Sequence, residues 1–180
     1  MKKGVKDIKI ERVYLIFIRY VLLLGLIFTL PLIYRIFTPL TLYPVAGLLG
    51  LIYEQVNINR DFILIGFHTI IQLVPACIAG SAYILLLILN LSVSMKLRKR
   101  IYAIILSFAI LLALNILRIF FLAVLYHNGN SFFDITHKFL WYGLSTVFVV
   151  GIWFLIVRIF SIKQIPVYTD IKDILKTIKK

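Results

Sequence analysis

Four residues of this 180-residue chain, Cys77, Asn115, Arg118 and His137, could together carry out acyl transfer. A cysteine thiolate attacks carbonyl carbons, and a nearby cation or helix N-terminus favours the thiolate over the thiol. A histidine can take up the thiol proton and later give it to the leaving amine. An arginine can stabilise the tetrahedral oxyanion or bind the substrate backbone. Asn115 lies three residues before Arg118, on the same helical face, and is expected to support it.

Each of these residues also has a purely structural interpretation. A lone cysteine at the start of a helix is often a small packed apolar residue. Arg118 could extend its charge to the headgroup layer, and His137 could cap a helix at the membrane interface. The functional interpretation therefore depends on whether the fold brings the side chains together.

Other titratable residues are weaker candidates. His127 rivals His137 as the base, whereas His68 lies in an apolar stretch and is expected to be structural. Asp134 could orient His137 from three residues away, although an N-cap for the following helix is the favoured interpretation. The histidines and the cysteine lack the ligand spacing of a zinc site, so we expect no metal. No sequence motif calls for a cofactor.

The composition is that of an integral membrane protein. Hydrophobic residues make up 62% of the chain and the mean hydropathy is +1.03, far above the values of a soluble domain. The formal charge of +13 comes from basic residues that cluster between apolar runs. We therefore expect membrane lipids, and no nucleic acid, as partners. A single cysteine excludes an internal disulfide.

The apolar runs predict an all-α bundle of about four transmembrane helices in one membrane domain, residues 1–180. Residues 38–76 are expected to form an outer-face segment, with an amphipathic helix around Pro39 and Pro44 and a strand-like stretch at 62–74 before the cysteine. In an alternative with six crossings, 38–53 and 62–76 would each span the membrane. The predicted transmembrane helices cover residues 13–37, 77–95, 101–126 and 138–160.

The distribution of Lys and Arg predicts the orientation. Basic residues cluster in the tail 1–12, the loop 96–100 and the amphipathic tail 161–180, whereas the loop 127–137 has none. The positive-inside rule then places both termini in the cytoplasm of a multi-pass plasma-membrane protein. No small-residue cleavage site follows the first apolar run, so we expect a retained anchor helix.

Counting residues from the cytoplasmic loop predicts that the candidate residues share one depth. Arg118 is about 17 residues along the third apolar helix, or roughly 25 Å from the inner face at 1.5 Å per residue. Cys77 and His137 both lie where predicted helices begin on the outer side. The three side chains are therefore expected at the outer membrane boundary.

Three motifs resemble the core of the exosortase and archaeosortase family, which are membrane-embedded cysteine transpeptidases. The motifs are VPACIAGS at 74–81, LNILRI at 114–119 and THK at 136–138. The resemblance covers roughly residues 39–154, and the chain would be a minimal member without the extra N-terminal helices of larger ones. The glycine that often follows the family histidine is at best Gly143 here.

The resemblance implies a role for each matched residue. Cys77 would be the nucleophile of a cysteine-type peptidase and transpeptidase, Arg118 the catalytic arginine and His137 the acid and base. The substrates would be exported proteins that carry a C-terminal motif, one apolar helix and a basic cluster. Cleavage outside the membrane would sort them to the cell surface by transfer to a lipid or amine acceptor.

A non-catalytic membrane subunit for transport or assembly is the competing interpretation. In such a protein Arg118 would pair with a lipid phosphate or with a carboxylate of a partner. Cys77 would then be a packing residue.

Overall fold

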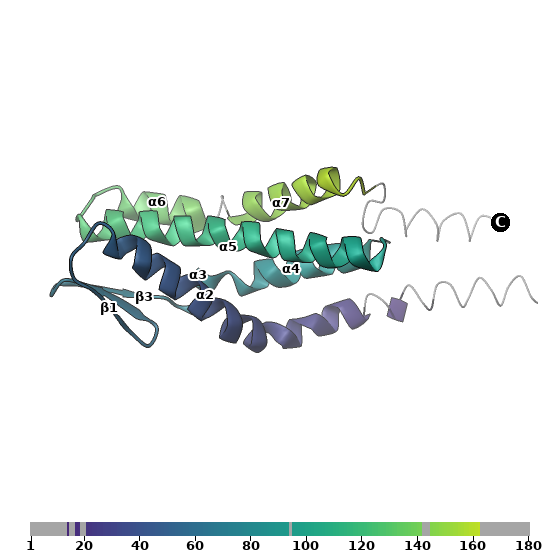
Figure 1. The fold of residues 1–180 in the computed structure, drawn as a ribbon, viewed down its shortest axis with the longest axis horizontal. Helices are drawn as coiled ribbons and strands as arrows, with labels where there is room; N and C mark the ends of the chain where they lie inside the picture. Colours follow the sequence, from purple (N-terminus) through teal and green to yellow (C-terminus); the bar gives the residue numbers. More distant parts are fainter. Residues whose placement is uncertain (1–13, 15–16, 19–20, 94, 142–144, 163–180) are drawn as a thin grey trace, which may run out of the picture.

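The computed structural model describes residues 14, 17–18, 21–93, 95–141 and 145–162. Its fold is a mostly helical bundle with one small sheet at its end (Figure 1). In chain order the elements are η1 (Leu26–Thr29), α2 (Leu30–Gly50), β1 (Val56–Asn59), β2 (Phe62–Ile65), β3 (Thr69–Gln72), α3 (Pro75–Ile78), α4 (Gly80–Ser92), α5 (Leu97–His127), α6 (Phe133–Phe139) and α7 (Ser145–Ile159).

Helix α5 is the centre of the bundle and packs against α2, α4, α6 and α7 (Figure 1). Its buried residues recur at every fourth position, so each lies beside the one before it and together they form a stripe that winds around a helix with 3.6 residues per turn. Several are small, so neighbouring helices can approach closely. The buried residues of α5 are Ala103, Ser107, Leu111, Asn115, Ile119 and Ala123.

Three helices are long and apolar enough to cross a membrane: Val21–Gly50, Pro75–Ser92 and Leu97–His127. A shorter apolar helix covers Thr146–Ile159. Large apolar side chains such as Phe28 and Phe154 remain exposed on the outside of the bundle. Such an outer surface is compatible with a membrane protein, because lipid tails solvate it.

The first helix does not end at residue 37, and the prediction of a separate amphipathic helix in 38–53 is wrong. Helix α2 continues to Gly50 with Pro39 and Pro44 inside it, and it bends along its length (Figure 1). Proline costs a backbone hydrogen bond and kinks a helix. The helix nevertheless continues, because a buried face of seven residues of α2 packs against α4 and α5.

The strand-like prediction for 62–74 is confirmed in its type. The separate spans that the six-crossing alternative needs at 38–53 and 62–76 are not found, because the first belongs to α2 and the second contains β2 and β3. Strands β2 and β3 occupy this stretch and pair antiparallel, with Ile63 opposite Ile71. Gly66 takes a positive φ of 60° in the turn between them, where glycine is not strained. Strand β1 pairs with β2 and lies in 54–61, a polar segment for which no strand was predicted.

The sheet and α6 lie at one end of the bundle, and the turn between α4 and α5 lies at the opposite end (Figure 1). The basic segment 96–100 lies at that end, although it is not a loop as predicted: α5 begins at Leu97 and includes residues 97–100 in its first turn. The expected fourth span, 138–160, is divided between α6 and α7 in the described residues. The basic tail 1–12 and residues 163–180 of the predicted amphipathic tail lie outside the described residues, as does Gly143.

Candidate active site

A break between α3 and α4 positions Cys77. Helix α3 is one turn long, and Ala79 ends it in the left-handed conformation with φ 59° and ψ 39°. Helix α4 begins at the next residue, Gly80, where an added Cβ would lie 2.6 Å from the ring of Tyr34 on α2. A side chain at position 80 would therefore force the ring of Tyr34 to move. The turn and the close approach of α2 together fix the backbone beside the cysteine.

Two side chains of α5 bind the main chain of the cysteine. Asn115 donates a hydrogen bond from Nδ2 to the Cys77 carbonyl oxygen at 2.9 Å, and Arg118 donates one from a terminal guanidinium nitrogen at 3.0 Å. The helix break frees this carbonyl for side-chain donors, because it interrupts the regular i to i+4 bonding. The Cys77 N–H donates to the Val74 carbonyl at 2.8 Å. The nucleophile candidate therefore has a well-defined backbone position.

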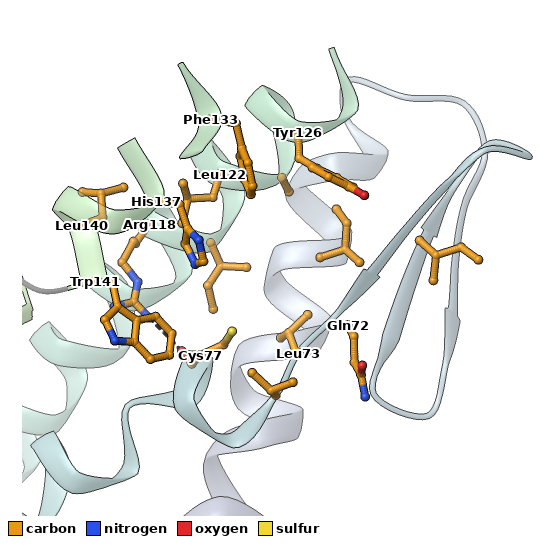
Figure 2. Close-up of a pocket in the computed structure, with 15 residues that line it drawn as sticks. Gln72, Leu73, Cys77, Arg118, Leu122, Tyr126, Phe133, His137, Leu140 and Trp141 are labelled. Atoms are coloured by element: carbon orange, nitrogen blue, oxygen red, sulfur yellow. Dashed lines mark hydrogen bonds between the residues drawn. The ribbon is translucent and has the colours of Figure 1, made fainter. Parts of the chain in front are cut away.

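Cys77, Arg118 and His137 all line one cavity of about 400 Å³ at the sheet end of the bundle. Figure 2 shows the sulfur and the imidazole directed into the same space, with Arg118 beside them. Most of the wall is apolar, so a substrate bound there would be largely shielded from water. The remaining lining residues are Ile70, Ile71, Gln72, Leu73, Val74, Ile119, Leu122, Ala123, Tyr126, Phe133, Leu140 and Trp141.

Two aromatic residues hold His137 from either side along α6 and its end. Its ring stacks on Phe133 with centroids 5.4 Å apart and meets Trp141 edge-on at 5.8 Å. The three residues are spaced four apart, which puts them on one helical face. This spacing is visible in the sequence and could have identified Phe133 and Trp141 as part of the site. The prediction that His137 begins the fourth helix is only approximate, since it lies inside α6.

The other histidines and Asp134 do not belong to the cavity wall. His127 shares a hydrogen bond of 2.8 Å between its Nδ1 and the Thr69 hydroxyl, and its ring meets Tyr53 edge-on. It therefore ties the end of α5 to β3. His68 is exposed in the turn before β3. Asp134 is exposed in the first turn of α6, and the N-cap of α6 is Phe132, so the capping prediction is wrong.

The donor set of the described residues suits proton transfer and covalent chemistry at sulfur more than metal ligation. In this part of the chain, no group of three or more His, Cys, Asp or Glu residues is placed to hold a metal ion. The polar groups of the lining residues include a thiol, a guanidinium and an imidazole, besides the amide of Gln72, the hydroxyl of Tyr126 and the indole N–H of Trp141. A nucleophile, a proton carrier and a fixed positive charge are the components that acyl transfer requires.

Sequence reasoning missed the contribution of the sheet to the cavity. Five consecutive residues, 70–74, form one wall of it. No family model matches the chain, and it has no significant match among curated proteins or among solved structures.

Proposed function

We propose that the protein is an exosortase- or archaeosortase-like cysteine peptidase and transpeptidase that cleaves C-terminal sorting signals of exported proteins. The observation that carries this proposal is the single cavity lined by Cys77, Arg118 and His137, which come from three elements far apart in the chain. The family-like motifs at 74–81, 114–119 and 136–138 add to it. An apolar cavity fits a substrate that is cut next to its own membrane helix.

The proposed topology has four crossings, with both termini in the cytoplasm of a plasma-membrane protein. The residues of α5 that line the cavity lie between Arg118 and Tyr126, near the end of the helix, whereas the basic segment 96–100 lies at its start. Since basic loops stay on the cytoplasmic side, the cavity would face outward. The fourth crossing would run through α6 and α7, of which α7 has 15 residues. An outward-facing site is where the sorting signal of an exported protein arrives.

The proposed reaction proceeds through a thioester. His137 takes the proton from the thiol of Cys77, and the sulfur attacks the scissile carbonyl carbon, forming a C–S bond. The guanidinium of Arg118 stabilises the negative charge on the carbonyl oxygen. When the C–N bond breaks, His137 gives its proton to the leaving amine, which departs with the C-terminal helix of the substrate. An acceptor amine, a lipid-linked acceptor or water then attacks the thioester and restores the thiol.

Trapping this thioester tests the proposed function directly. Hydroxylamine attacks the thioester carbonyl, breaks the C–S bond and leaves a hydroxamate on the new C-terminus of the substrate. In cells of the source organism treated with hydroxylamine, mass spectrometry should find surface proteins that end in a hydroxamate upstream of an apolar helix. Surface proteins that all keep their C-terminal helices and carry no hydroxamate would contradict the proposal.

Arg118 and Asn115 offer a matched pair of variants, because both donate to the Cys77 carbonyl. Removing either donor should lower the free energy of unfolding by about 1–3 kcal/mol. Only Arg118→Ala should also lower the rate of processing by about 10²–10³-fold, because it alone removes the positive charge from the cavity. Thermal unfolding in detergent and processing rates below the melting temperature measure the two effects.

The same pair of variants distinguishes the peptidase proposal from the competing one, a non-catalytic transport or assembly subunit. The hydrogen bond from Arg118 to the Cys77 carbonyl favours that proposal, because it gives Arg118 a structural role. Equal loss of function in Asn115→Ala and Arg118→Ala, in proportion to lost stability, would assign Arg118 to structure alone.

A further inference from the structure

The open edge of β3 lies next to the cavity. The sheet has the order β1-β2-β3, so β3 pairs on one side only within the described residues. Ile70 and Gln72 on this strand are exposed. An unpaired strand edge presents backbone N–H and C=O groups that can pair with another chain. Natural proteins usually cover such an edge, so an open one beside a candidate active site requires an explanation.

The register shows which backbone groups point toward the open edge. Leu73 donates its N–H to the Asp61 carbonyl at 2.9 Å, and Ile71 is directly opposite Ile63. In an antiparallel ladder the hydrogen-bonded pairs alternate, so residues 69, 71 and 73 direct their backbone groups toward β2. The N–H and C=O groups of Ile70 and Gln72 therefore point away from β2.

The cavity runs along this edge and not along one face of the sheet. Residues 70–72 of β3 all line it, although successive side chains of a strand point to opposite faces, and Leu73 and Val74 after the strand line it too. A space that contacts three consecutive residues of a strand lies beside the strand. In Figure 2, β3 leads into the turn of α3 that carries Cys77, and α5 and α6 form the opposite wall.

We propose that β3 binds the substrate as an added strand. An extended segment of the exported polypeptide would pair with the backbone of Ile70 and Gln72, and its scissile bond would then lie at the sulfur of Cys77. The inference rests on the proposed function for the identity of this occupant. Main-chain pairing provides affinity, and the apolar wall of α5 and α6 would select apolar side chains on the bound segment.

Two features argue for a polypeptide over a lipid acyl chain in this groove. The backbone donors and acceptors of Ile70 and Gln72 would be left without partners beside a hydrocarbon chain, which is unfavourable away from water. The edge is also close to the reactive thiol along the chain, since only two residues separate the end of β3 from the start of α3, the helix that carries Cys77. A strand added at β3 would therefore lie close to Cys77.

The test uses a peptide reagent that alkylates the only thiol of the chain. Full-length protein in membrane vesicles is treated with acetyl-trivaline chloromethyl ketone and with two N-methylated derivatives of it, which are isomers of each other and carry their one N-methyl group on adjacent residues. Adjacent N–H groups of a strand point in opposite directions. One isomer should therefore label Cys77 at least about tenfold more slowly than the parent reagent, and the other at a similar rate.

Two substitutions of Gln72 complete the test. Gln72→Pro removes an N–H at the open edge, a position where proline is tolerated in a strand, and Gln72→Ala keeps it. Gln72→Pro should abolish the difference between the isomers and Gln72→Ala should retain it. Labelling by iodoacetamide, which makes no strand contacts, should be the same in both variants and shows that the site remains folded.

The outcomes separate this inference from the proposed function. Equal labelling by the two isomers in the wild-type protein would overturn strand addition and would favour a groove for acyl chains or for side chains alone. Hydroxamates on surface proteins together with equal labelling would leave the peptidase proposal intact. A clear preference between the isomers without hydroxamates would support a peptide groove in a protein that is not a transpeptidase.

Discussion

In membranes that carry Cys77→Ser, cleavage of the sorting signals should fall by at least about 10³-fold, because a hydroxyl beside a histidine is a far poorer nucleophile than a thiolate unless the site is built for it. Cys77→Ala should show the same loss. Exported proteins would then keep their C-terminal helices, which mass spectrometry of the membrane fraction detects as longer chains.

The serine variant is informative because it changes little else. Serine is close in size to cysteine, and the backbone carbonyl of residue 77, which accepts hydrogen bonds from Asn115 and Arg118, is left in place by the substitution. The melting temperature in detergent should therefore change little. If Cys77→Ser retained full processing, the thiol would be a packing residue and the protein would belong to the non-catalytic class.

The convergence of the candidate residues could be predicted from the sequence because helices have a constant rise. Counting from the basic loop 96–100 put Arg118 near the far end of α5, and Cys77 and His137 adjoin loops at that same end. The cavity contains all three side chains. The position of a residue along the bundle is thus readable from charge and length, whereas the direction of a side chain around a helix axis is set by packing.

The backbone of α2 could not be predicted because long-range packing outweighed local preference. Pro39 and Pro44 argue against a continuous helix, yet α2 runs through both of them. In hydrocarbon a broken helix would expose many backbone groups without partners. Losing a few hydrogen bonds inside a bent helix is the less costly solution.

The turn that positions the cysteine was also hidden in the sequence. The left-handed residue is Ala79, although Gly80 follows it and would adopt that conformation with less strain. The glycine is instead needed where α4 meets Tyr34. The preference of glycine for the left-handed conformation would have put the turn one residue later, at Gly80. The sequence therefore did not show that the Cys77 carbonyl would accept hydrogen bonds from Asn115 and Arg118.

Strand β1 was missed for a simpler reason. Its residues Val56–Asn59 are mostly exposed and include two asparagines, which are uncommon in strands. Pairing with β2 holds this segment extended. Because β1 covers the far edge of β2, the edge of β3 is the one that the described residues place beside the cavity.

Histidine substitutions should separate the two candidate bases. His137→Ala should lower the rate of processing by about 10²–10⁴-fold, the usual contribution of a positioned acid and base. His127→Ala should leave the rate within a few-fold and lower the free energy of unfolding by about 1 kcal/mol, because it loses the hydrogen bond to Thr69. Processing assays and thermal unfolding of both variants measure these effects.

Added imidazole provides the sharper readout. The rings of Phe133 and Trp141 would still flank the space left by His137→Ala, so free imidazole should enter it and restore part of the activity. A histidine with only a structural role would not be replaced in this way, since a small diffusible base cannot reconnect two elements. The reverse result, loss and rescue in His127→Ala, would move the base to His127 and require the sheet to shift, because Thr69 and Tyr53 now hold that ring.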